Sequence, residues 1–302
     1  MKKIKTYHSA PLFCLAVYIL ITLSLLFNVP YDGSIYSVLA VSVLQIAIFI
    51  LPGVLYCRLE GTVSPKELGF RGFRIQNVAL IIFAALFLFS LSVLFGLADP
   101  DYVQTGAVTD VTSLSPQAVI YITVIYCILP AVTEEFVFRS IIYNKYKKYG
   151  VFSAAAFSSV LFALAHFSLS ELPKFLICGV VLALVYEVSH SVFVSIAVHF
   201  LFNLLTVFSQ KLLTDAAGKS ENTVPFIFLF VSIALITLFL SLSRAQSQLE
   251  YDSVSIRPAD NEKEQTFQFR MRALLLSFLS PAFLCCVIFA VAAAIIRLKH
   301  NV

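Results

Sequence analysis

Six polar residues interrupt the apolar runs in the middle of the chain, and their types are those of a hydrolytic site. They are Glu134, Glu135, Arg139, His166, His199 and Asn203. Glu135 and Arg139 are four residues apart, as are His199 and Asn203, so each pair shares one face of a helix. A carboxylate can act as a general base on water, and imidazole or amide N–H groups can stabilise an oxyanion. The set therefore predicts acid–base hydrolysis, provided that the elements carrying it bring it together.

The elements that must position these residues are membrane-spanning helices. Hydrophobic residues make up 60% of the 302 residues and charged residues only 13%, against roughly 25% charged residues in a soluble domain. A spanning helix needs about 20 mostly apolar residues. The apolar stretches are residues 11–29, 34–57, 77–97, 117–147, 151–169, 173–189, 191–209, 225–243 and 273–296. We therefore expect an all-α fold, a polytopic membrane helical bundle of about nine transmembrane helices.

The composition and charge also exclude several classes of protein. An ordinary soluble globule is excluded, and so is a disordered chain, because disorder requires low hydrophobicity. The net charge of +4 gives no sign of nucleic-acid binding.

If the N-terminus is cytoplasmic, fifteen of the 21 Lys and Arg residues lie on the cytoplasmic side and five on the other, which is the bias expected for that orientation. We expect an integral protein of a bacterial plasma membrane with a cytoplasmic N-terminus.

The sequence divides the chain into three regions. Residues 1–116 are expected to form an N-terminal three-helix region, and residues 117–209 a core of four helices that carries all six polar residues. Residues 210–302 are expected to form a two-helix C-terminal region, in which the polar stretch 244–272 is a cytoplasmic loop. Pro130 should kink its helix just before the glutamates, because it removes a backbone hydrogen bond.

Helix geometry predicts that the polar residues converge. Counting about 1.5 Å of rise per residue from the turn at Gly150 places Glu134 and His166 each about 24 Å from that turn. Counting from Ser191 in the same way places His199 about 12 Å deep. These levels overlap within a hydrocarbon core about 30 Å thick, so the three groups can share one pocket.

The same side chains allow a second chemistry, because imidazole nitrogen and carboxylate oxygen are also zinc ligands. A zinc site would use Glu134, His166 and His199. However, the sequence contains no H-E-x-x-H motif, and its six cysteines form no C-x-x-C pair. We therefore favour no bound cofactor and keep zinc as the alternative.

The six polar residues fall into three short motifs, which follow one another along the chain, each within a predicted span. These motifs resemble those of the CPBP family of CAAX proteases and bacteriocin-processing enzymes, also called the Abi family. The matching motifs are Glu134-Glu135-x-x-x-Arg139, Phe162-x-x-x-His166 and His199-x-x-x-Asn203. The family includes the type II CAAX prenyl endopeptidase. The resemblance covers residues 117–209.

The resemblance implies an intramembrane endopeptidase of the glutamic type, formerly described as a metalloprotease. It implies that Glu134 is the general base that activates water, with assistance from His166. It further implies that His199 and Asn203 form the oxyanion site. Glu135 and Arg139 would be supporting members of the site. The expected partners are membrane lipid and a peptide or protein substrate at the membrane, with no nucleic acid.

Two other functions stay open from the sequence. The helical core could be a non-catalytic membrane scaffold that regulates a partner protein such as a sensor kinase. It could also be a proton-coupled transporter with the two glutamates as a relay, although the sequence shows no internal repeat of the kind on which many transporters are built. The substrate, the cleavage site and the oligomeric state are not indicated by the sequence.

Overall fold

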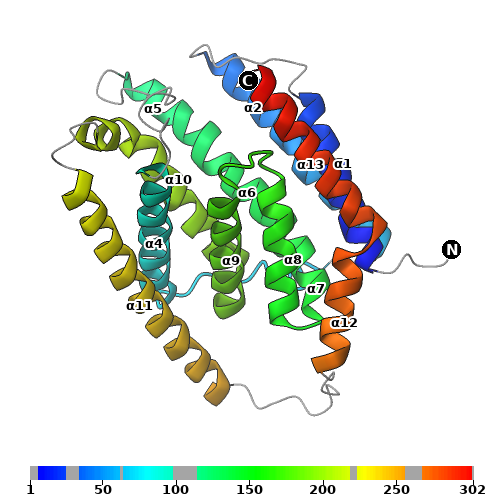
Figure 1. Ribbon diagram of the computed structural model, residues 1–302. Coiled ribbons are helices and arrows are strands. Elements are labelled where there is room, and N and C mark those ends of the chain that lie inside the picture. Colours follow the sequence, from blue (N-terminus) through cyan, green and yellow to red (C-terminus); the bar gives the residue numbers. More distant parts are fainter. Residues whose placement is uncertain are drawn as a thin grey trace.

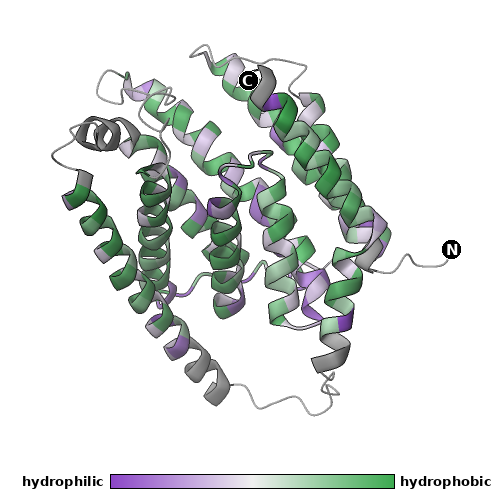
Figure 2. Ribbon diagram, in the orientation of Figure 1, coloured by the Kyte–Doolittle hydropathy of each residue, from purple (hydrophilic) through white to green (hydrophobic). Residues whose placement is uncertain are grey.

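The protein is described here by a computed structural model of residues 6–24, 34–61, 64–97, 114–217, 223–255 and 267–300. Every regular element within these residues is a helix. The helices lie side by side in one bundle (Figure 1), and most of them are hydrophobic along much of their length (Figure 2). The predicted fold class, a polytopic helical membrane bundle, is confirmed.

The length and apolarity of the described helices support fewer than nine membrane spans. Six helices are long and apolar enough to cross a membrane, and a bent pair of helices adds a seventh span if it is counted as one. Val151–Leu164 and Ser9–Ser24 are apolar helices that are shorter than a full span. Part of the first predicted span, residues 25–29, lies outside the described residues. The expected count of nine is therefore not confirmed.

The N-terminal region supplies one short helix, one broken span and one long helix. These are α1 (Thr6–Ser24), then α2 (Ile35–Gln45), η2 (Ile46–Ile50) and α3 (Leu51–Glu60), then α4 (Asn77–Leu97). Ser34 caps α2, because its hydroxyl accepts the backbone N–H of Ser37. Gly61 ends α3 in the left-handed conformation, at a φ of 74°, which glycine adopts without steric cost.

The central region carries the candidate site on one continuous span and three further helices. The span comprises α5 (Pro116–Ile122), η4 (Thr123–Ile128), α6 (Leu129–Glu135), η5 (Phe136–Tyr143) and α7 (Asn144–Lys147). It is followed by α8 (Val151–Leu164), α9 (Leu172–Ser189) and α10 (Val192–Ala217). A π-helical turn, η4, ends two residues before Pro130, and the kink expected at Pro130 stays a prediction. A second π-helical segment, η5, follows Glu135 directly, and such turns are frequent at functional sites.

The C-terminal helices flank the central region on two sides. They are α11 (Thr223–Ser255), α12 (Phe267–Phe278) and α13 (Pro281–His300). α11 packs along α4, and α13 packs along α1 (Figure 1). The stretch 244–272, which we predicted as a loop, is helical in its described parts, because α11 continues to Ser255 and α12 begins at Phe267. Gln, Glu, Leu and Arg favour helices, so the polar stretch extends the helices at both of its ends.

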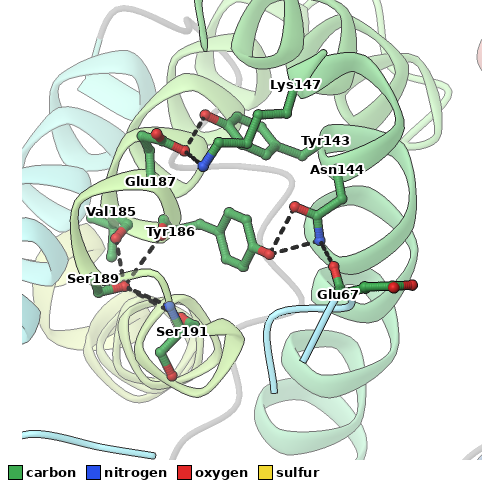
Figure 3. Close-up of polar contacts among 9 residues, drawn as sticks. All are labelled: Glu67, Tyr143, Asn144, Lys147, Val185, Tyr186, Glu187, Ser189 and Ser191. Atoms are coloured by element: carbon green, nitrogen blue, oxygen red, sulfur yellow. Dashed lines mark hydrogen bonds and ion pairs between the residues drawn. The ribbon is translucent and has the colours of Figure 1, made fainter. Parts of the chain in front are cut away.

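A polar cluster fastens the segment 64–76 to one end of the bundle (Figure 3). The side-chain amide of Asn144, on α7, donates to the backbone carbonyl of Glu67 at 2.9 Å and lies 2.7 Å from Tyr186 Oη. The carbonyl of Gly69 accepts the first backbone N–H of α10 at 2.9 Å. Gly69 is required here, because its φ is 77° and the ring of Tyr186 occupies the space of a Cβ. The cluster ties together the elements that carry the candidate site.

Candidate active site

Glu135 lies at the centre of the candidate site, buried between Arg139 and His199. Its Oε1 atom is 2.9 Å from Arg139 Nη1 and 3.0 Å from His199 Nδ1. The side chains of Glu135 and Arg139 are 0% exposed, and that of His199 is 4% exposed. One carboxylate oxygen therefore joins the span of the first motif to α10. The first and third motifs meet, as their helical spacing predicts.

Arg139 connects this carboxylate to the next two helices of the core. Its Nη2 atom donates to the backbone carbonyl of Gly179, on α9, at 3.0 Å. Its Cζ atom lies 4.7 Å from the centre of the Phe162 ring, on α8, within the range of a cation–π interaction. Gly179 allows α9 this close, because a Cβ there would lie only 2.9 Å from Ser159 Cα on α8. The guanidinium thus holds three helices together.

Glu134 differs from its neighbour in having no hydrogen bond within the described residues. The residue is half-buried, and its Oε2 atom is buried without a hydrogen-bond partner there. It lies close enough to His199, Glu135 and Arg139 to interact with their charges. A buried carboxylate oxygen ordinarily has a partner such as water. The carboxylate of Glu134 is therefore the better candidate to bind water or a substrate N–H, whereas Oε1 of Glu135 is held by Arg139 and His199 and only its Oε2 is without a partner.

His166 joins the site through Phe162. It lies on the turn after α8, with Nδ1 2.9 Å from the carbonyl oxygen of Phe162. The ring of Phe162 contacts both imidazoles, with centroids 4.8 Å from His166 and 5.9 Å from His199. Because a carbonyl oxygen only accepts, Nδ1 must carry the hydrogen, and Nε2 of the neutral ring is an acceptor. Because Phe162 contacts both imidazoles, the second motif belongs to the same cluster.

Asn203 is the least connected of the six predicted residues. It is half-buried, one helical turn beyond His199 on α10. Among the contacts of the described residues, no hydrogen bond joins its amide to the other five residues. The structure thus brings five of the predicted residues into one cluster, and it places the sixth beside them on the same helix as His199.

The geometry does not fit the zinc alternative as the side chains stand. In the described part of the chain, no group of three or more His, Cys, Asp or Glu side chains is placed to hold a metal ion. In addition, Nδ1 of His166 and Nδ1 of His199 are both directed at protein oxygen atoms. A site made of Glu134, His166 and His199 would therefore have to form through Nε2 of both rings after rearrangement.

The structure also places residues at the site that the sequence analysis did not assign to it. Phe175, on α9, stacks on the ring of His166 at 3.7 Å. Gln45, at the end of α2, places Oε1 3.2 Å from Oγ1 of Thr133, the residue before the glutamate pair. The signal for Gln45 was a single amide inside an apolar span, which is costly without a partner. Phe175 had no signal, because phenylalanine is common throughout this chain.

The segment that carries the candidate site is similar to known proteins. Residues 116–205 match the family described as "Type II CAAX prenyl endopeptidase Rce1-like". The chain is also 32% identical over 108 residues to a Bacillus subtilis (strain 168) protein named "Putative membrane peptidase YdiL". That match covers 35% of this chain and 43% of the relative. No solved structure matches the chain.

These matches coincide with the segment that carries the three motifs. All six predicted residues lie within residues 116–205. The same segment supplies the buried cluster around Glu135. Residues 116–205 are therefore similar to the CAAX-protease family over the segment that carries the candidate site.

Proposed function

We propose that the protein is an intramembrane endopeptidase that hydrolyses peptide bonds of membrane-associated peptides or proteins with water activated by Glu134. The observation that carries the proposal is the contrast within the glutamate pair. Oε1 of Glu135 is engaged by Arg139 and His199, whereas the carboxylate of Glu134 makes no hydrogen bond with the described residues; Oε2 is buried and without a partner in both glutamates. The similarity of residues 116–205 to the CAAX-protease family supports the same proposal.

In the proposed reaction, Glu134 accepts a proton from water while the water oxygen bonds to the peptide carbonyl carbon. The carbonyl π electrons move to its oxygen, which becomes an oxyanion. When the C=O bond forms again, the C–N bond breaks, and Glu134 returns the proton to the leaving amine. Positioned general-base catalysis of this kind contributes about 10²–10⁴-fold in rate.

The two histidines take different roles because their Nδ1 atoms have different partners. His166 donates Nδ1–H to a neutral carbonyl, so its Nε2 can accept the second hydrogen of the attacking water. His199 directs Nδ1 at the carboxylate of Glu135. It can donate to an oxyanion only through Nε2, so this role requires His199 to carry both ring protons. Asn203 supplies a second donor in the proposed oxyanion site, as a side-chain amide does in other hydrolases.

The substrate side of the proposal rests on the membrane setting. A site on helices of this length and apolarity is reached most readily by a peptide that is itself anchored in the bilayer or delivered by it. The bias of Lys and Arg favours a cytoplasmic N-terminus. With that orientation we place the protein in a bacterial plasma membrane.

The direct test is cleavage of quenched fluorogenic peptides with a membrane anchor by the purified full chain in lipid nanodiscs. We expect Glu134→Gln and His166→Gln to lower kcat at least about 100-fold while the thermal unfolding midpoint stays near that of the wild type. Glu67→Gln is the matched control, because the side chain of Glu67 is exposed. Cleavage by Glu134→Gln at the wild-type rate would refute the role of Glu134.

The metal question needs a separate measurement. We expect cleavage to survive exhaustive chelation and elemental analysis to find less than one zinc per chain. Loss of activity on chelation, with recovery on adding zinc, would overturn the metal-free mechanism and return Glu134, His166 and His199 to the role of ligands.

A further inference from the structure

We propose that Phe175 is a positioning residue that holds the imidazole of His166 in one orientation and one tautomer, with Nε2 left free for the reacting water. The inference deepens the proposed function and rests on it for the role of Nε2. Neither the motifs nor the matched family description names Phe175. The proposal is carried by the geometry around His166.

His166 does not have the support of a complete helix. α8 ends at Leu164, and the backbone N–H of His166 reaches only the carbonyl of Ala163, at 3.3 Å. The next residue, Phe167, has a φ of 48°, a left-handed conformation that is unfavourable for a residue with a Cβ. The orientation of the imidazole must therefore be fixed by the contacts of its ring.

One of these contacts selects the tautomer. Nδ1 of His166 lies 2.9 Å from the carbonyl oxygen of Phe162, and this oxygen can only accept a hydrogen bond. The neutral ring is therefore protonated at Nδ1, and Nε2 has no hydrogen-bond partner in the described part of the chain. Rotation of the ring about χ2 by half a turn would break this bond and move Nε2 away.

Aromatic rings prevent that rotation. Phe175 stacks on His166 with centroids 3.7 Å apart and planes 20° apart, while Phe162 meets the same ring at 4.8 Å and 63°. The ring of Phe175 therefore covers one face of the imidazole, and the ring of Phe162 approaches the imidazole at a steep angle. A rotating imidazole would have to displace the stacked ring.

Phe175 is itself held in place. Nζ of Lys174 lies 4.9 Å from the centre of its ring, and Lys174 forms an ion pair with Glu171. The start of α9 thus supports the ring that stacks on His166. Phe175 is half-buried, so replacing it leaves no large internal cavity.

The test uses the full chain in nanodiscs, with Phe175→Leu and Phe175→Met to remove the flat ring and Phe175→Tyr to keep it. Because Phe175→Leu and Phe175→Met both lack a ring that can stack, the test remains valid if one of these two non-stacking variants fails to fold. The matched control is Phe152→Leu, because Phe152 is on α8 and 71% exposed. The readouts are kcat and KM for peptide cleavage and the ¹⁵N resonances of the His166 ring, assigned by their loss in His166→Gln.

For the wild type we expect a hydrogen-bearing Nδ1 and an unprotonated Nε2. Phe175→Leu and Phe175→Met should populate both tautomers and lower kcat about tenfold, with KM within about twofold. Phe175→Tyr and Phe152→Leu should match the wild type in both readouts. A purely structural role of Phe175 would lower stability without changing the tautomer.

Two results would overturn the proposal. One is a wild-type His166 with its hydrogen on Nε2. The other is an unchanged tautomer in both non-stacking variants. Because the ring resonances require no substrate, they decide the role of Phe175 even if the wild type cleaves no peptide, which would refute the proposed function alone.

Discussion

Gly179→Ala tests whether the close approach of α8 and α9 positions the candidate site. A Cβ at residue 179 would lie 2.9 Å from both Cα and Cβ of Ser159. That is about 0.5 Å shorter than the lower end of ordinary van der Waals contact. Because Cα of Ser159 is backbone, it cannot swing aside, so the helices must separate. Overpacking of this kind costs about 1–3 kcal/mol of unfolding free energy.

The same shift reaches the site through Arg139. The carbonyl of Gly179 accepts from Arg139 Nη2 at 3.0 Å, and Nη1 of that guanidinium lies 2.9 Å from Glu135. A carbonyl displaced by half an ångström either loses this bond or moves the guanidinium with it. Since a misplacement of about 1 Å can cost 10²-fold in rate, we expect kcat to fall about tenfold.

The assay is peptide cleavage with kcat and KM measured separately, together with thermal unfolding in the same nanodiscs. Gly72→Ala is the matched control, because a Cβ at Gly72 has nothing within 4 Å. Adding Ser159→Gly to Gly179→Ala removes the contact with Cβ but leaves the 2.9 Å contact with Cα, so it should not restore the activity. A Gly179→Ala protein with wild-type kcat and wild-type unfolding would refute the reasoning.

Three further substitutions test other contacts of the core. Arg139→Lys should lower kcat at least about tenfold and lower the free energy of unfolding by about 1–3 kcal/mol, because lysine cannot bridge a carboxylate and a carbonyl as a planar guanidinium does. Peptide cleavage and chemical denaturation measure these two effects. Asn144→Ala should speed hydrogen exchange in residues 64–76 while kcat stays within about twofold, since Asn144 holds Glu67; unchanged exchange would contradict the tethering role. Gln45→Leu should raise KM several-fold relative to Ser42→Ala, whose hydroxyl bonds only within its own helix, because it removes the acceptor for Thr133 beside the glutamate pair; equal KM values would contradict this positioning role.

Much of the architecture could be predicted from the sequence because the bilayer constrains it. A chain in lipid must satisfy its backbone groups internally, so each long apolar run had to be a helix. Spacing of four residues placed Glu135 and Arg139 on one face, and they form an ion pair there. The extent of α11 was harder to predict, since Arg244 begins a polar stretch that is equally compatible with a loop and a solvated helix.

The detailed site could not be predicted, because it depends on contacts between helices. Glu134 and Glu135 are chemically identical neighbours, and only the positions of Arg139 and His199 show which one is engaged. The acceptor for Arg139 Nη2 is a backbone carbonyl, which carries no residue-type signal. The π-helical segment η5 is likewise invisible in the sequence, because its residues are mostly apolar.

The arrangement also explains how a buried cluster with so many ionisable groups can perform the proposed reaction. In the proposed reaction, Glu134 begins as an anion beside Glu135, Arg139 and His199. When Glu134 takes a proton from water, its negative charge is lost and one negative charge appears on the oxyanion, so the net charge of the site is unchanged. In an interior of low dielectric constant, creating net charge is costly, whereas moving charge between preorganised partners is favourable. In this proposal Glu135 is the fixed anion that pairs with Arg139, which leaves the carboxylate of Glu134 available to accept the proton.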